Sequence, residues 1–376
     1  MLNIKTIEPT PSPNTMKIIL TEELPKGTSN NYKKDQSEHA PQVIQDILQV
    51  EGVKGVYHVA DFLAVERNAK YDWKEILSNV RECFGESPAA NGISGPADDA
   101  FGEVKASVQM YNGIPMQVKL TDGMQEKRYA LPQRFQDILF SVQQHASNVV
   151  LNRVWKDHGV RYGDMDEIGN DMVEELSAAY KEERLKRIAQ QMINKEEGVQ
   201  AISRPAYKVT EEMMEEPEWT ARYAHLEQMD PKAEDLDVLR KALSDEKASI
   251  RRLAVVYLGM IEDEAVLPLL YKALEDKSVT VRRTAGDCLS DIGDPKAIPA
   301  MMASLKDKNK LVRWRAAMFL YEVGDEQALE ALKAAEDDPE FEVSMQIKLA
   351  IGRIEGGEEA MGSVWKQMTE SRKTSE

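Results

Sequence analysis

A 31-residue repeat fills most of residues 236–354 and constrains the fold more than any other feature of the sequence. Four aspartates recur at this spacing, and a branched aliphatic residue follows each of them five positions later. The aspartates are Asp245, Asp276, Asp307 and Asp338, and the aliphatic residues are Ile250, Val281, Val312 and Val343. Self-similarity with a period of about 20–50 residues is typical of a solenoid, in which each unit buries its apolar face against its neighbours.

Each repeat is expected to form two short helices. Apolar residues recur three and four positions apart over two stretches of the repeat, and this is the spacing of one helical face. In one repeat these positions are Leu267, Leu270 and Leu274, followed by Val281, Ala285, Leu289 and Ile292.

The order of charged residues in the repeat resembles HEAT-type repeats, because an aspartate is followed six positions later by the arginine of a Val-Arg pair. The resemblance implies an α-α solenoid over residues 219–360 that binds other proteins. It also implies that aspartate and arginine hydrogen-bond from repeat to repeat, as a charge-assisted ladder would. The alternative is that the arginines contact a ligand. The residues concerned are Asp245, Asp276, Asp307, Arg251, Arg282 and Arg313.

Composition and charge narrow the possible partners and location. The 65 acidic and 48 basic residues give a formal net charge of −17, which disfavours a phosphate backbone as the main partner. Only two cysteines occur, so a disulfide scaffold is not expected and a reducing compartment fits. The first residues do not look like a signal peptide, and no apolar run reaches the length of a membrane span. We therefore expect a cytoplasmic protein that binds neither nucleic acid nor membrane.

The first part of the chain, residues 1–86, is expected to fold as a small β-β-α-β-β-α domain. Its sequence resembles the N-terminal domain of Nfu/NifU-type iron–sulfur scaffold proteins. The matching stretches are Pro-Ser-Pro-Asn-Thr-Met-Lys-Ile (11–18), Val-Glu-Gly-Val-Lys-Gly-Val-Tyr (50–57), Asp-Phe-Leu-Ala-Val (61–65) and Trp73, with Ser12 where that family usually has Asn.

The resemblance to iron–sulfur scaffolds implies a docking role and no cluster of its own. Those scaffolds hold their cluster in a separate domain with a C-x-x-C motif, because iron–sulfur ligation needs thiolates. This chain has no such motif, and Cys83 is expected to be a small, half-buried residue. We therefore expect no cofactor, and interaction with iron–sulfur assembly components or their clients.

The middle of the chain is less clearly specified. Residues 87–100 are expected to be a linker, and residues 101–218 a region of one β-hairpin and several helices. A three-residue loop, 111–113, would pair Val108 with Met116 and keep one face apolar. A helix is expected from Pro132 to about Val154, with further helices at about 165–180 and 182–194. Residues 361–376 are expected to be a polar tail.

Over nearly the whole chain, the sequence resembles the conserved virulence factor C family of Gram-positive bacteria. The phrases that carry this resemblance are Lys-Ala-Leu-Glu-Asp-Lys-Ser (272–278), Val-Arg-Arg-Thr-Ala-Gly-Asp-Cys (281–288), Val-Arg-Trp-Arg-Ala-Ala-Met-Phe (312–319) and Gly-Ser-Val-Trp-Lys-Gln-Met (362–368). It implies a cytoplasmic accessory protein that influences the production of virulence factors.

Three residues that directly follow the ladder arginines are candidates for partner binding: Arg252, Arg283 and Trp314. In a helix they point about 100° away from the ladder, where exposed Arg and Trp are frequent binding anchors. A solvated edge is the alternative. The sequence thus favours a non-enzymatic interaction or adaptor protein.

The competing hypothesis is an enzyme or cluster carrier with its site in the middle region. It rests on four residues that are close in sequence: Arg153, His158, Arg161 and Asp164. An ordinary helix end would explain the same residues, because basic groups are favourable near helix carbonyls.

Overall fold

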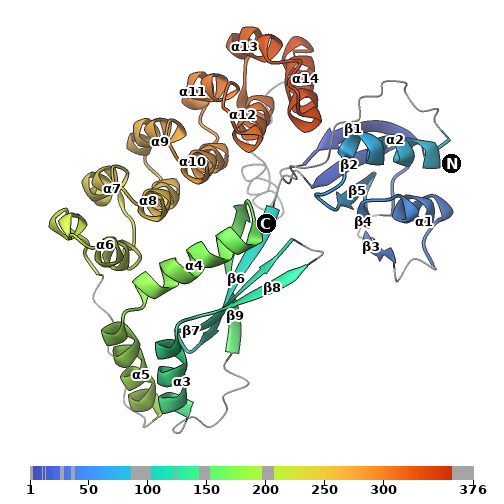
Figure 1. The fold of residues 1–376 in the computed structure, drawn as a ribbon. Helices are drawn as coiled ribbons and strands as arrows, with labels where there is room; N and C mark the ends of the chain where they lie inside the picture. Colours follow the sequence, from blue (N-terminus) through green and yellow to red (C-terminus); the bar gives the residue numbers. More distant parts are fainter. Residues whose placement is uncertain are drawn as a thin grey trace. The chain divides into compact units, whose positions relative to one another are not determined.

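The computed structural model describes residues 3–10, 12, 14–25, 29–34, 39–85, 103–122, 125–143, 153–196 and 207–357. The chain divides into two compact units, residues 1–103 with 335–349, and residues 104–334 with 350–376. The α+β architecture is as predicted: a strand-rich N-terminal region, a mixed middle and a helical C-terminal region of HEAT repeats (Figure 1). The predicted linker (87–100) and tail (361–376) lie outside the described residues.

The first unit is built on a five-stranded antiparallel sheet with strand order β1-β2-β5-β4-β3. Strand β3 is additional to the predicted order β-β-α-β-β-α, because its polar sequence gave no strand signal. The elements are β1 (Ile4–Pro9), β2 (Thr15–Leu20), β3 (Ser29–Lys33), α1 (Gln42–Gln49), β4 (Val53–Val59), β5 (Phe62–Arg67) and α2 (Trp73–Cys83).

One face of this sheet forms a closed apolar core with the helices. Ile18 and Leu63 of the sheet pack with Ile44 of α1 and Trp73 of α2, and all four are fully buried. The opposite face carries the residues of the other parity, where Lys17 lies over the ring of Phe62 at 4.7 Å. Tyr57 of β4 is 40% exposed on that face. We call this face the open face of the sheet.

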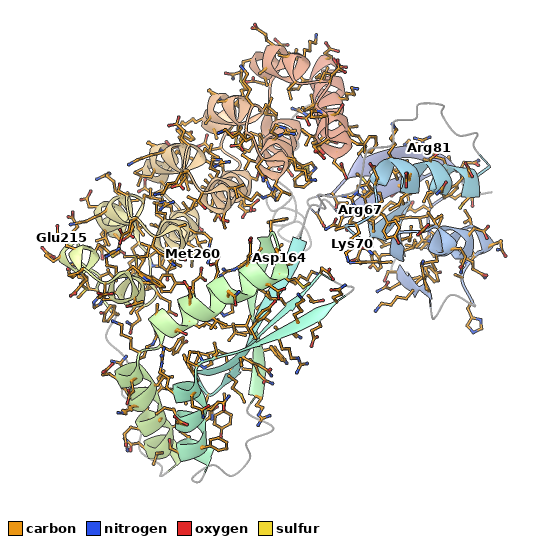
Figure 2. All side chains as sticks on the ribbon, viewed as in Figure 1. Arg67, Lys70, Arg81, Asp164, Glu215 and Met260 are labelled. Atoms are coloured by element: carbon orange, nitrogen blue, oxygen red, sulfur yellow. The ribbon has the colours of Figure 1, made fainter. Side chains whose placement is uncertain are left out.

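Residues 335–349 also belong to the first unit, which the predicted domain of residues 1–86 did not include. This segment contains the start of helix α14 (Phe341–Glu355), and Phe341 and Met345 pack on the apolar core. Arg67, labelled in Figure 2, is buried and lies 2.7 Å from Glu342. Burying a guanidinium is costly unless it is paired, and Glu342 supplies the counter-charge.

The second unit begins with a four-stranded sheet of order β8-β7-β6-β9. Strands β6 (Glu103–Tyr111) and β7 (Ile114–Thr121) form the predicted hairpin. The predicted three-residue loop is wrong, because Tyr111 pairs with Ile114 across a two-residue turn. Both turn residues, Asn112 (φ 46°) and Gly113 (φ 92°), are left-handed, as a type I′ turn requires. A bulge between Gln109 and Met110 then shifts the register and sets Val108 opposite Val118, which keeps the apolar face intact.

The predicted helix from Pro132 to Val154 is confirmed at its start, where helix α3 covers Gln133–Gln143, and is wrong at its end. Residues 153–162 form an edge strand, β9 (Arg153–Tyr162), and residues 144–152 lie outside the described residues. The apolar residues of this strand alternate poorly, and residues 153–160 are exposed, so the sequence carried little strand pattern. Strand β8 (Glu126–Ala130), which was not predicted, completes the other edge of the sheet.

Two helices close the middle region, α4 (Met165–Ala179) and α5 (Glu182–Glu196), near the predicted bounds. They and α3 pack with the sheet into one apolar core. Its buried members extend from Val104 to Ala189, and its partly buried members from Met116 to Met192. No residue of the solenoid is among them, so the middle region completes its own apolar core.

The solenoid forms two rows of helices (Figure 1). The first helices of the repeats make one row, and the longer second helices make the other. These elements are α6 (Trp219–Leu226), α7 (Leu236–Ala242), α8 (Ala248–Met260), α9 (Leu267–Leu274), α10 (Val279–Ile292), α11 (Ile298–Ser304), α12 (Lys310–Val323) and α13 (Leu329–Ala334).

Candidate functional site

A ladder of arginine–aspartate pairs joins successive repeats of the solenoid. Arg251 donates to both carboxylate oxygens of Asp276 at 2.7 and 2.9 Å, and Arg282 does the same to Asp307 at 2.7 and 2.9 Å. Each arginine also donates to the carbonyl of an aspartate in its own repeat, as Arg313 does to Asp307 at 3.0 Å. These arginines are therefore engaged in holding the repeats together.

The first rung of the ladder does not follow the 31-residue register. Arg222 of α6 precedes Arg251 by 29 residues, yet it makes the same paired contact, to Asp245 at 2.6 and 3.0 Å. Like Arg251, it also donates to the carbonyl six residues before it, here that of Glu216. Strict register counting misses this rung because α6, at 8 residues, is shorter than α8, at 13, and the longer connection that follows α6 does not make up the whole difference.

We expect Asp276→Ala to lower the free energy of unfolding by roughly 1–3 kcal/mol, because it leaves Arg251 without its charged partner. Asp276 also accepts a hydrogen bond from the Ser278 amide, a helix-capping contact. Asp294→Ala is the matched control, since Asp294 caps the Lys296 amide and makes no ladder contact in the described part of the chain. Denaturant unfolding should show the larger loss for Asp276→Ala. Equal losses would mean that only capping matters.

The three residues predicted to bind a partner lie on the second helices of consecutive repeats, and we call them the concave strip: Arg252, Arg283 and Trp314. Our expectation that they are exposed is wrong. Arg283 and Trp314 are 3% and 2% exposed, and the side chain of Arg252 is 17% exposed. The physical reason is that side chains of the middle region cover them: Glu175 of α4 contacts Arg252, and Tyr162, the last residue of β9, contacts Arg283.

A carboxylate of the middle region contacts the first residue of the strip. Glu175 of α4 accepts two hydrogen bonds from Arg161 of β9, at 2.6 and 3.3 Å. Arg252 approaches the same carboxylate at 3.3 and 3.4 Å. Burial alone would raise the pKa of Glu175, but the charges of Arg252 and Arg161 outweigh it and lower the pKa to about 2. Glu175 therefore stays ionised between two cations. Neighbouring Glu174 makes a more exposed ion pair with Lys247 at 2.9 Å.

An aromatic residue of the middle region contacts the second residue of the strip. The guanidinium of Arg283 lies 4.5 Å from the ring centroid of Tyr162 and donates to its hydroxyl at 3.3 Å. The same guanidinium lies 5.4 Å from the ring of Trp314, and Arg315 lies 5.3 Å from that ring. Asp287 supplies the counter-charge to both arginines. The strip is thus a row of cations and one indole that accepts an acid and a phenol.

The four residues behind the enzyme hypothesis are not a helix end, because β9 is a strand. Arg161 is engaged by Glu175, and Asp164 caps α4 by accepting from the amides of Asp166 and Glu167 (Figure 2). Arg153 and His158 are exposed on β9. The structure thus gives two of these residues a positioning role within the middle region.

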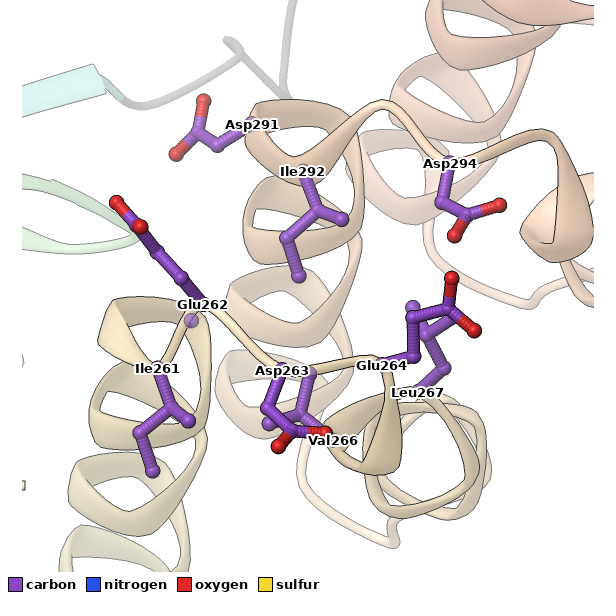
Figure 3. Close-up of a pocket in the computed structure, with 10 residues that line it drawn as sticks. Ile261, Glu262, Asp263, Glu264, Val266, Leu267, Asp291, Ile292 and Asp294 are labelled. Carbon is purple, nitrogen blue, oxygen red and sulfur yellow. The ribbon is translucent and has the colours of Figure 1, made fainter. Parts of the chain in front are cut away.

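The solenoid also has a cleft of about 600 Å³ beside the loop between α8 and α9. Figure 3 shows its carboxylates in two groups, Glu262 and Asp291 on one side and Glu264 and Asp294 on the other. Asp263 and Asp294 cap the following turns, and Glu264 pairs with Lys296. Most of these acids therefore already serve the turns between repeats.

Both cysteines lie where burial favours the neutral thiol over the thiolate. Burial raises the pKa of Cys83 and, much more strongly, that of Cys288. Among the described residues, no group of three or more His, Cys, Asp or Glu side chains could hold a metal ion.

Comparison with known proteins places each region. A family described as Scaffold protein Nfu/NifU N terminal matches residues 4–91, and one described as Virulence factor matches residues 109–189. HEAT repeats match residues 208–286 and 267–352. A Staphylococcus aureus protein named Conserved virulence factor C is 50% identical over 98% of this chain and 99% of its own length. The chain belongs to the conserved virulence factor C family.

The family assignment confirms the resemblance seen in the sequence. Conserved virulence factor C of Staphylococcus saprophyticus is 44% identical over 99% of this chain and all of its own length. A Bacillus subtilis protein named Uncharacterized protein YpgR is 69% identical over the full length of both chains. A crystal structure of a Staphylococcus aureus protein is 44% identical and covers 22% of this chain and 96% of its own, with a TM-score of 0.20.

This chain thus combines an Nfu-type N-terminal domain, a virulence-factor domain and HEAT repeats, and HEAT repeats suggest protein–protein interaction. In the portion of the chain that the structure describes, no helix is long and apolar enough to cross a bilayer.

Proposed function

We propose that this chain is a non-enzymatic adaptor that holds two proteins, one on its N-terminal domain and one on its solenoid. The observation that carries the proposal is the concave strip, whose cations and indole recognise side chains of a polypeptide. Arg252 contacts a carboxylate and Arg283 a phenol, both from the middle region. Clustered Arg and Trp side chains are the commonest anchors of protein interfaces. Side chains of this kind, which the middle region covers in this structure, suit protein binding better than they suit catalysis.

The N-terminal domain supplies the second binding surface. Its resemblance to iron–sulfur scaffold proteins favours docking of iron–sulfur assembly components or their clients. The open face of its sheet, with Tyr57 exposed and Phe62 under Lys17, is an apolar and basic surface for such a partner. An accessory role of this kind in the cytoplasm accords with the virulence-associated names of its relatives.

Site-specific photo-cross-linking in the native cell tests the adaptor proposal. A photoreactive amino acid at Tyr57 or at Met260, which is 61% exposed on α8 (Figure 2), should give defined and different protein adducts. Phe140 of α3, 64% exposed, is the matched control outside both surfaces and should give no defined adduct. Absence of defined adducts at both Tyr57 and Met260 contradicts the proposal.

The cluster-carrier alternative has a simple optical test. Protein purified without air should show none of the visible absorbance of an iron–sulfur cluster. A coloured product that contains iron and sulfide would favour a carrier over an adaptor.

A further inference from the structure

The contact between the middle region and the solenoid is polar at the concave strip. Glu175 meets Arg252, Glu174 meets Lys247, and Tyr162 meets Arg283. The apolar core of the middle region contains no solenoid residue, so these contacts do not continue that core. Ion pairs that leave water lose hydration roughly equal to what they gain in attraction. Helix α4 also packs against α6, which gives the middle region a second attachment to the solenoid. At the strip itself, side chains of the same kinds from another protein can therefore replace the polar contacts at little net cost in free energy.

The same contacts define the chemistry that the strip accepts. It takes one carboxylate on Arg252 and one aromatic ring with a hydroxyl on Arg283, one repeat further along. Packed helices lie about 10 Å apart, so the two groups need to be about 10 Å apart in a partner.

We propose that the concave strip binds an acidic and aromatic segment of a partner protein, and that Tyr162 and helix α4 are an internal occupant which this segment displaces. The inference rests on the adaptor function proposed above and adds the regulation of its solenoid surface. A protein whose binding-competent state is rarely populated binds with an affinity reduced by that population. Weakening the internal contact therefore strengthens binding of the outside segment.

A double variant can weaken the contact between the middle region and the concave strip while leaving Glu175 in place. Glu174→Lys places a cation opposite Lys247, and Tyr162→Phe removes the hydroxyl that Arg283 contacts. The Glu174 side chain is 55% exposed, so the charge reversal leaves the core of the middle region intact. Glu183→Lys, an equal charge reversal at an exposed position of α5, is the matched control.

The test is binding of a fluorescent synthetic peptide to the full chain. The peptide has the sequence of residues 160–179, which includes both Tyr162 and Glu175. We expect the double variant to bind it at least about tenfold more tightly than the wild type and the Glu183→Lys control do. Adding Arg252→Gln to the double variant, or replacing Tyr162 and Glu175 of the peptide by Phe and Gln, should abolish the gain.

Equal peptide binding by the wild type and the double variant would overturn the inference, and so would a gain that survives Arg252→Gln. Circular dichroism and the melting temperature establish that each variant is folded. If the double variant does not fold, Glu174→Lys alone is measured and should still bind more tightly than Glu183→Lys. Defined cross-links at Met260 without any peptide effect would leave the adaptor function standing and remove only the displacement mechanism.

Discussion

Replacing Glu175 with alanine is expected to lower the free energy of unfolding by about 3–5 kcal/mol, because it leaves two buried cations without their shared counter-charge. Arg161 and Arg252 converge on this one carboxylate, whose side chain is 8% exposed. Urea unfolding of the full chain, followed by circular dichroism, measures the loss. Glu174→Ala is the adjacent control and should cost about 0–1 kcal/mol, since its ion pair with Lys247 is largely solvated.

The same residue predicts a pH dependence of stability. The pKa of Glu175 in the folded chain is about 2, below its ordinary value of 4.5. Its contribution is therefore complete above about pH 4.5 and is lost as the pH falls toward 2. The shift corresponds to about 3 kcal/mol. Glu175→Ala should lose this part of the acid sensitivity, so its destabilisation relative to wild type should shrink between pH 6 and pH 3. A constant difference over that range would contradict the assigned ionisation.

Trp314→Ala is expected to cost about 3–5 kcal/mol, because it removes a fully packed indole from the second row of helices. Trp314 is 2% exposed, and the guanidiniums of Arg283 and Arg315 lie 5.4 and 5.3 Å from its ring. Trp155→Ala is the matched control, since that indole also faces cations, Lys119 at 4.3 Å among them, but is 38% exposed. It should cost only about 1–2 kcal/mol.

Thermal or denaturant unfolding, monitored by the unfolding transition of the solenoid, distinguishes the two tryptophan variants. If both lose the same stability, Trp314 is not the packed centre of the strip. If Trp314→Ala loses none, the strip is more open than its contacts indicate.

The solenoid was predictable from the sequence because its repeats are local and regular. The aspartate at position 276 and the arginine at 251 both keep the register, and each rung needs only adjacent repeats. The contact of Arg222 with Asp245 was not predicted, because the first repeat is shorter than the others and Arg222 does not keep the register. The two-residue turn at Asn112 was missed for a different reason: a bulge corrects the register, and a bulge leaves no mark in an apolar pattern.

The surroundings of the concave strip could not be predicted, although its three residues could. Whether Arg252 meets solvent or Glu175 depends on where α4 packs, and these residues are 77 positions apart. Strand β9 is exposed along residues 153–160, so nothing in its composition showed that Tyr162 at its end reaches Arg283. Contacts between separate regions depend on tertiary packing that a pattern within one segment does not encode.

The ladder has a consequence for how the solenoid comes apart. Each rung aspartate is shared: Asp276 holds the arginine of the preceding repeat and the first turn of its own second helix, through Ser278. Asp307 does both for the next repeat, through Asn309. When one repeat unfolds, the arginine of the neighbouring repeat therefore loses its charged partner. That neighbour is then less stable and unfolds more easily in turn. The repeats are therefore expected to unfold cooperatively and not one by one.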